Sequence, residues 1–118
     1  MLLRLAGLLL ALGLVAGAAP SPSNADRAPV ARLAPVQVKI QNFAFSPTPV
    51  TIARGRTVVW TNRDVLFPHT VVVVRGPRFF RSPLIRPGET FSHTFRVSGR
   101  YAYKCGIHPF MRGVVVVR

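Results

Sequence analysis

Short runs of β-prone residues, separated by turn residues, occupy the chain from Val36 onward. Side chains alternate between the two faces of a strand, and no segment has a helical period of useful length. Seven runs separated by turn signals such as SPTP and RPGE predict an all-β domain, either a sandwich or a barrel. The runs are 36–40, 50–53, 57–61, 69–74, 90–95, 100–105 and 113–117.

The first residues have a different pattern. Residues 1–19 combine an early arginine, an apolar stretch from Leu5 to about Val15 and then small residues, which is the layout of a secretory signal. The apolar stretch is shorter than the roughly 20 residues that span a bilayer. An uncleaved N-terminal anchor is the alternative. Small residues favour cleavage after Ala18 or Ala25.

A segment rich in Pro, Ala and Ser, residues 20–35, follows the signal and is typical of a tether without structure of its own. We therefore expect a signal peptide over 1–25, a flexible tether over 26–35 and a folded domain over 36–118. The exported product is expected in the periplasm, without a membrane span once the signal is cleaved.

Charge is strongly one-sided, with 16 Lys and Arg against 3 Asp and Glu, a formal net charge of +13. Such a balance indicates acidic partners or an anionic surface. Solubility combined with a compositional bias toward arginine would explain it equally well. Nucleic acid is not expected as a partner, because the basic residues are scattered singly along an exported chain.

The chemistry-bearing residues cluster near the end of the chain. Cys105, His108 and Met111 stand at C-x2-H-x2-M spacing in a loop between two predicted strands. Cys105 is the only cysteine, and Met111 is the only methionine besides the initiator. His69 begins another strand. Two imidazoles and a thiolate with a weak axial thioether are the ligands of blue-copper sites, which predicts one type 1 copper ion.

Each candidate ligand has a simpler structural explanation. A lone Cys is often a buried thiol, and a lone Met is often core filler. His93 competes with His69, but it shares a strand face with Phe91 and Phe95, so we expect it in or near the core. Trp60 and the two tyrosines before Cys105 are expected to pack rather than to carry electrons.

From Val36 to Arg118 the sequence resembles a small cupredoxin of the plastocyanin, pseudoazurin and amicyanin group. The loop CGIHPFM and the strand after it are most similar to amicyanin. VVWTN followed by Asp64 and Pro68-His69 resembles the segment that carries the first copper histidine. The resemblance implies a Greek-key β-sandwich of about eight strands and a soluble one-electron carrier in which His108 reaches the surface through an apolar patch.

Two residues depart from this group. Thr70 replaces an asparagine that ties the ligand loops together, and its hydroxyl is expected to do part of that work. Ile107 replaces a proline and keeps its N–H. We expect that N–H, together with the N–H of Thr70, to donate to the Cys105 sulfur and raise the reduction potential.

The leading hypothesis is therefore a monomeric electron carrier that docks briefly with acidic redox partners near His108. The alternative is a periplasmic protein for copper storage or delivery, although the chain lacks the Met-rich or His-rich tracts of that class. An enzyme is not expected, because multicopper oxidases and copper nitrite reductases need further copper centres and the chain has 3 histidines. Candidate docking residues are Arg63, Arg75, Arg78, Arg81, Arg100, Lys104 and Arg112.

Overall fold

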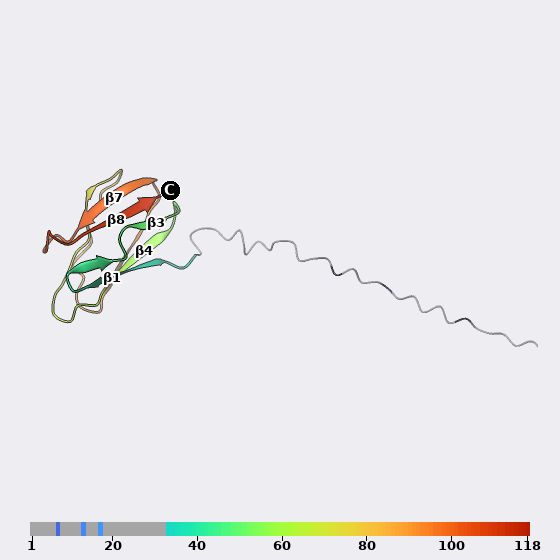
Figure 1. Ribbon diagram of the computed structural model, residues 1–118, viewed down its shortest axis with the longest axis horizontal. Coiled ribbons are helices and arrows are strands. Elements are labelled where there is room, and N and C mark those ends of the chain that lie inside the picture. Colours follow the sequence, from blue (N-terminus) through green and yellow to red (C-terminus); the bar gives the residue numbers. More distant parts are fainter. Residues whose placement is uncertain (1–6, 8–12, 14–16, 18–32) are drawn as a thin grey trace, which may run out of the picture.

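The computed structural model describes Gly7, Gly13, Gly17 and residues 33–118. Apart from these three glycines, the predicted signal peptide over 1–25 lies outside the described residues, as does most of the predicted tether. Within them the protein is a sandwich of two sheets, with β1 and β4 in one layer and β7 and β8 in the other (Figure 1). None of the described residues forms a helix long and apolar enough to cross a membrane.

Eight strands build the sandwich, which confirms the all-β prediction. They are β1 (Val36–Gln41), β2 (Ala44–Ser46), β3 (Val50–Ile52), β4 (Thr57–Asn62), β5 (Val72–Arg75), β6 (Thr90–Thr94), β7 (Gly99–Lys104) and β8 (Arg112–Val117).

The strand order is β2-β1-β4-β6 in one sheet and β3-β8-β7-β5 in the other. Two neighbouring pairs, β1 with β4 and β3 with β8, run parallel, and the remaining pairs run antiparallel. The parallel pairs are joined by connections that cross between sheets. This gives the Greek-key arrangement that the resemblance implied, and it brings the ends of β1, β4 and β7 toward one end of the sandwich.

The alternation of each strand fills the space between the sheets. In β4, Val58, Trp60 and Asn62 are buried while the residues between them are partly exposed. Tyr101 and Tyr103 of β7 face the same interior. Trp60 and Tyr103 meet edge to face with ring centroids 5.5 Å apart, a favourable geometry for aromatic pairs. Both rings pack in the core, as expected.

Two elements differ from the predicted runs. β2 was missed because it has three residues and follows a two-residue turn, Asn42-Phe43, that lacks glycine. Both turn residues have positive φ, 54° and 57°, which side chains other than glycine adopt at a cost. The run at 69–74 was placed too early: β5 begins at Val72, and His69 instead forms an isolated bridge with Ile85.

Gly113 provides a test of the core packing. A Cβ at this position would lie 2.2 Å from the Tyr103 Cζ atom, on the partner strand. We expect Gly113→Ala to lower the free energy of unfolding by about 1–3 kcal/mol, because the ring or the strand must shift. Urea unfolding of the metal-free protein measures this. Gly76→Ala is the control, because a Cβ added there would lie 3.0 Å from its nearest neighbouring atom. An equal loss of unfolding free energy in both variants would contradict the packing argument.

Candidate metal centre

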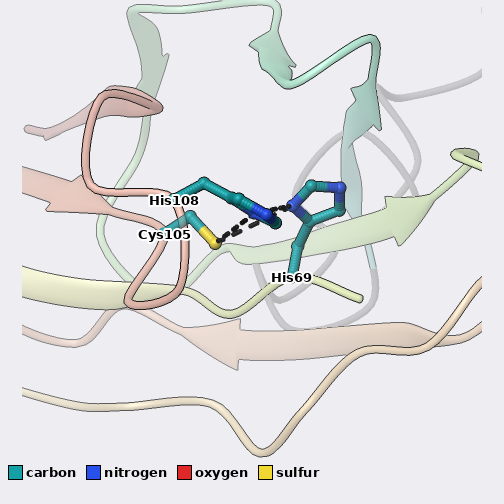
Figure 2. A group of neighbouring side chains, drawn as sticks. All are labelled: His69, Cys105 and His108. Carbon is teal, nitrogen blue, oxygen red and sulfur yellow. Dashed lines mark hydrogen bonds between the residues drawn. The ribbon is translucent and has the colours of Figure 1, made fainter. Parts of the chain in front are cut away.

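Three side chains converge at one end of the sandwich. The Cys105 sulfur lies 3.8 Å from His69 Nδ1 and 3.7 Å from His108 Nδ1, and the two nitrogens are 3.2 Å apart. Figure 2 shows all three atoms pointing into the same space, with His69 arriving from a different segment than Cys105 and His108. The structure thus brings together three of the four predicted ligands around one point.

The hydrogen bond between His69 and Asp64 determines which ring nitrogen faces the converging atoms. His69 Nε2 lies 2.6 Å from a carboxylate oxygen of Asp64, so Nε2 holds the ring proton and donates it. His69 Nδ1 therefore presents a lone pair, directed at a thiol sulfur and at another imidazole nitrogen. Electron-rich atoms that face one another in a buried site are best satisfied by a positive ion. Soft sulfur and imidazole donors fit copper.

The ligand loop of residues 105–111 is tightly closed. The Cys105 N–H donates to the Met111 carbonyl at 3.0 Å, and the Met111 N–H donates to the His108 carbonyl at 2.9 Å. Met111, the fourth predicted ligand, is 2% exposed. The loop therefore holds its cysteine, histidine and methionine in a fixed relation, with the methionine directly before β8.

His69 is held independently of that loop. Its backbone N–H and carbonyl exchange hydrogen bonds with Ile85 at 3.0 and 2.8 Å. The fully buried Asn62 organises the connection that leads to it, donating through Nδ2 to the carbonyls of Phe67 and Ile85 at 2.8 and 2.9 Å. Its Oδ1 accepts the N–H of Asp64. No local sequence pattern indicated this role of Asn62.

Asp64 lies behind His69 as a nearly buried carboxylate. Burial pushes its pKa upward, but hydrogen bonds from the Asn42 N–H and from His69 outweigh this and hold the pKa below its ordinary value. The group is therefore ionised at neutral pH. From the sequence, Asp64 was recognised only as part of the resemblance and had no assigned function.

The two histidines differ in exposure. His69 is completely buried, whereas His108 is partly exposed. Three aromatic rings surround the His108 ring, with centroids 5.1 Å (Phe43), 6.4 Å (Phe67) and 6.0 Å (Phe110) away. Phe67 and Phe110 are 44% and 69% exposed. We call these three rings the apolar rim; the resemblance implied an apolar patch at His108, but it did not indicate Phe43.

Thr70 links the two ligand segments, as expected. Its hydroxyl accepts the Gly106 N–H at 2.8 Å, and its own N–H donates to the Cys105 sulfur at 3.4 Å. The expected second donor, the Ile107 N–H, makes no such bond in the described part of the chain, so that expectation was wrong. The loop is anchored one residue earlier, through Gly106, and the Ile107 side chain is 47% exposed.

His93 lies outside the group, as expected. Its ring stacks on Phe80 with centroids 3.8 Å apart, and burial, with a smaller contribution from Arg96, lowers its pKa. Burial raises the pKa of Tyr103 to about 12, so this phenol stays neutral. Neither side chain supplies a donor to the convergent group.

Two four-stranded sheets with a buried His-Cys-His group at one end define a cupredoxin that binds one copper ion. Residues 34–118 match the copper binding proteins of the plastocyanin/azurin family, and the chain belongs to that family. The predicted fold, copper cofactor and resemblance to amicyanin are confirmed.

Individual relatives support this family assignment. The chain is 40% identical over 84 residues to amicyanin-alpha of Methylorubrum extorquens, covering 69% of this chain and 70% of that protein. A Cu(I) structure of an amicyanin mutant matches with a TM-score of 0.65 and 35% identity, covering 75% and 89% of the two chains. A copper-containing nitrite reductase from Thermus scotoductus matches with a TM-score of 0.68 and 36% identity, covering 72% of this chain but only 22% of that enzyme.

Thr70 gives the test of the link between the ligand segments. Thr70→Val keeps the shape and the N–H to sulfur bond but removes the acceptor for Gly106, so we expect a loss of about 0.5–1.5 kcal/mol of unfolding free energy. Thr70→Ser keeps the hydroxyl and is the control. Urea unfolding of the metal-free forms measures both, and a valine variant as stable as the serine variant would contradict the link.

Proposed function

We propose that this protein is a one-electron carrier whose copper is held by His69, Cys105, His108 and Met111. The observation that carries the proposal is the convergence of three donor atoms, of which only that of His108 belongs to a partly exposed side chain. When bound there, copper supplies a Cu(II)/Cu(I) couple. Met111 would supply a thioether as the fourth ligand, because it is buried at the close of the same loop.

The surrounding residues favour transfer over release. Cys105 and His69 are fully buried, and the three connecting segments are cross-linked by Asn62, Asp64 and Thr70. Ligands held in one geometry need little rearrangement when the charge of the site changes. A store or delivery protein would need a site that opens, so that alternative is the weaker one.

No bond-making chemistry is proposed. The site provides one convergent donor group, and the partly exposed His108 within it is surrounded by the aromatic rings of the apolar rim. The likeness to a nitrite reductase extends over 22% of that enzyme, so its catalysis is not transferred to this chain. The protein exchanges electrons with other molecules at the apolar rim.

The basic residues near the metal end supply a docking field. Lys104 and Arg112 lie directly opposite each other on β7 and β8, beside Cys105 and Met111. Like charges in this relation are destabilising, and neither has a carboxylate partner among the described residues. Arg63 and Arg81 line hollows next to Phe67 and Ile107. An acidic partner surface would relieve this repulsion, which favours transient docking of a monomer.

Other predicted docking residues are differently placed. Arg100 is the second residue of β7, at the far end of the strand from Cys105, and Pro77 packs against the neighbouring Gly99. Arg78 follows directly in that loop. These charges belong to the opposite end of the sandwich, so they are not assigned to docking at His108 and serve as controls.

Export to the periplasm is part of the proposal, with a signal peptide over 1–25, a flexible tether over 26–35 and a cupredoxin domain over 36–118. The apolar run and small residues near Ala18 and Ala25 support it, as does the start of β1 at Val36. N-terminal sequencing of the protein recovered from a periplasmic extract would locate the cleavage point.

The visible spectrum tests the ligand assignment. Addition of Cu(II) to the mature domain should give an intense band near about 600 nm that ascorbate bleaches, because a thiolate bound to copper produces charge transfer. Cys105→Ala should lose the band, while His93→Gln should keep it. A colourless wild-type protein, or a band that survives Cys105→Ala, would contradict the proposed site.

Rates of electron exchange with small inorganic complexes test the docking field. Oxidation by the anionic hexacyanoferrate(III) should slow as salt is added, because salt screens the basic residues. A Lys104→Gln, Arg112→Gln variant should lower the rate constant at low salt by about threefold or more. The matched variant Arg78→Gln, Arg100→Gln removes equal charge at the other end and should change it less. Equal decreases of the rate constant in both variants would show that the rate depends only on the net charge of the protein.

A further inference from the structure

One largely buried carboxylate makes contact with the proposed metal site without being a ligand. Asp64 Oδ2 lies 2.6 Å from Nε2 of His69, on the side of the ring opposite the converging atoms. The side chains of His69 and Asp64 are 0% and 9% exposed, so the pair is almost shielded from water. A charge-assisted hydrogen bond of this length, in this setting, is a strong one.

We infer that Asp64 is a positioning residue that fixes the tautomer of His69 and sets the reduction potential of the site to a lower value. This rests on the proposed function, because it takes His69 as a copper ligand. It adds a specific residue that controls how readily the carrier gives up its electron.

The carboxylate first determines the tautomer of His69. A neutral imidazole carries its proton on one nitrogen only. Because the Asp64 carboxylate can only accept, it requires the proton on Nε2 and leaves Nδ1 free to bind the metal. The ring is thus prepared for binding before any ion arrives.

The carboxylate also changes the charge that the metal experiences. An imidazole that donates to a carboxylate is a stronger electron donor at its other nitrogen. In addition, a negative charge in a poorly hydrated position interacts with the metal more strongly than one in water. Both effects favour Cu(II), the more highly charged state, over Cu(I), so both lower the reduction potential.

Hydrogen bonds on the far side hold the carboxylate itself in place. Oδ1 accepts the N–H of Asn42 at 2.7 Å, and the Asp64 N–H donates to Asn62 Oδ1 at 2.9 Å. The first of these bonds holds the turn that carries Phe43, whose ring meets both His69 and His108 edge-on. Asp64 therefore joins the buried histidine to the turn that covers it.

The chain provides a matched control in Glu89, the other acidic residue that the structure describes. Its carboxylate is 49% exposed, lies 3.9 Å from the Arg86 guanidinium and accepts the Arg86 N–H. Glu89 also lies near the metal end, since its carbonyl accepts the Asn62 N–H, but it does not contact His69. Glu89→Gln removes the same charge without removing a hydrogen bond to a ligand.

The experiment compares Asp64→Asn with Glu89→Gln by direct voltammetry and by competition titrations for Cu(I) and Cu(II). We expect Asp64→Asn to lower the ratio of Cu(II) to Cu(I) affinity about tenfold, equivalent to a potential higher by about 59 mV for one electron. Glu89→Gln should change the ratio by less than about twofold. An Asp64→Asn potential that is lowered, or equal to that of Glu89→Gln, would overturn the inference.

A second measurement does not need copper. In the metal-free protein, nitrogen-15 NMR of the histidine rings should show the His69 proton on Nε2. In the Asp64→Asn variant, the new amide oxygen can still accept the Asn42 N–H, but the amide nitrogen would then point a donor at Nε2–H. The proton should therefore move at least partly to Nδ1, and an unchanged tautomer would overturn the proposed control of the His69 ring. The NMR measurement also tests the role of Asp64 if the Asp64→Asn variant binds copper too weakly for voltammetry.

Asp64→Glu is the control for a simple folding defect. It keeps the charge on a longer side chain, so its potential should lie between those of the wild type and Asp64→Asn. A potential shifted as far as that of Asp64→Asn would count against the inference. The wild-type spectrum separates the two proposals: a protein without the blue band would overturn the copper site, whereas a blue protein with unshifted variants would overturn only the assignment of Asp64.

Discussion

The structure depends on the forced approach of three electron-rich atoms. Nδ1 of His69, Nδ1 of His108 and the sulfur of Cys105 all lie within 4.8 Å of one another, in a site that is mostly buried. Buried polar atoms are costly unless they have partners. The fold supplies partners for the groups around these atoms but leaves their lone pairs facing one another, so the stability of this end of the sandwich is linked to the ion that they bind.

The sandwich can maintain this arrangement because three separate segments are tied together near the site. The turn after β1 is bonded to Asp64, the connection after β4 is organised by Asn62, and the loop after β7 is bonded to Thr70. Each link joins residues far apart in sequence. The positive φ of Asn42 and Phe43 is a local cost that the hydrogen bond to Asp64 and the packing of the Phe43 ring offset.

The sequence was sufficient to predict most of the strands and the convergence of His69, Cys105 and His108, for different reasons. Alternating runs such as TVVWTN reveal a buried face, and three rare ligand types at C-x2-H-x2-M spacing indicate a metal chemistry. Short β2 and the role of Phe43 could not be predicted, because Asn-Phe is an unusual turn that tertiary bonds stabilise. The roles of Asn62 and Asp64 could not be predicted either. Their hydrogen bonds reach Ile85 and Asn42, 23 and 22 residues away, and such distant bonds leave no local sequence pattern.

The two histidines are equivalent as ligand types, but their surroundings give the site a direction. His69 is enclosed by Asp64 and the interior, so its outer nitrogen is committed to a hydrogen bond. His108 is partly exposed within hydrocarbon rings, which makes it the short path between the interior and a partner. A carboxylate placed at His108 would repel acidic partners and hydrate the contact. Placed behind His69, it would act on the metal without altering the docking surface. In the proposed carrier, potential and partner recognition would therefore be controlled from opposite sides of one site.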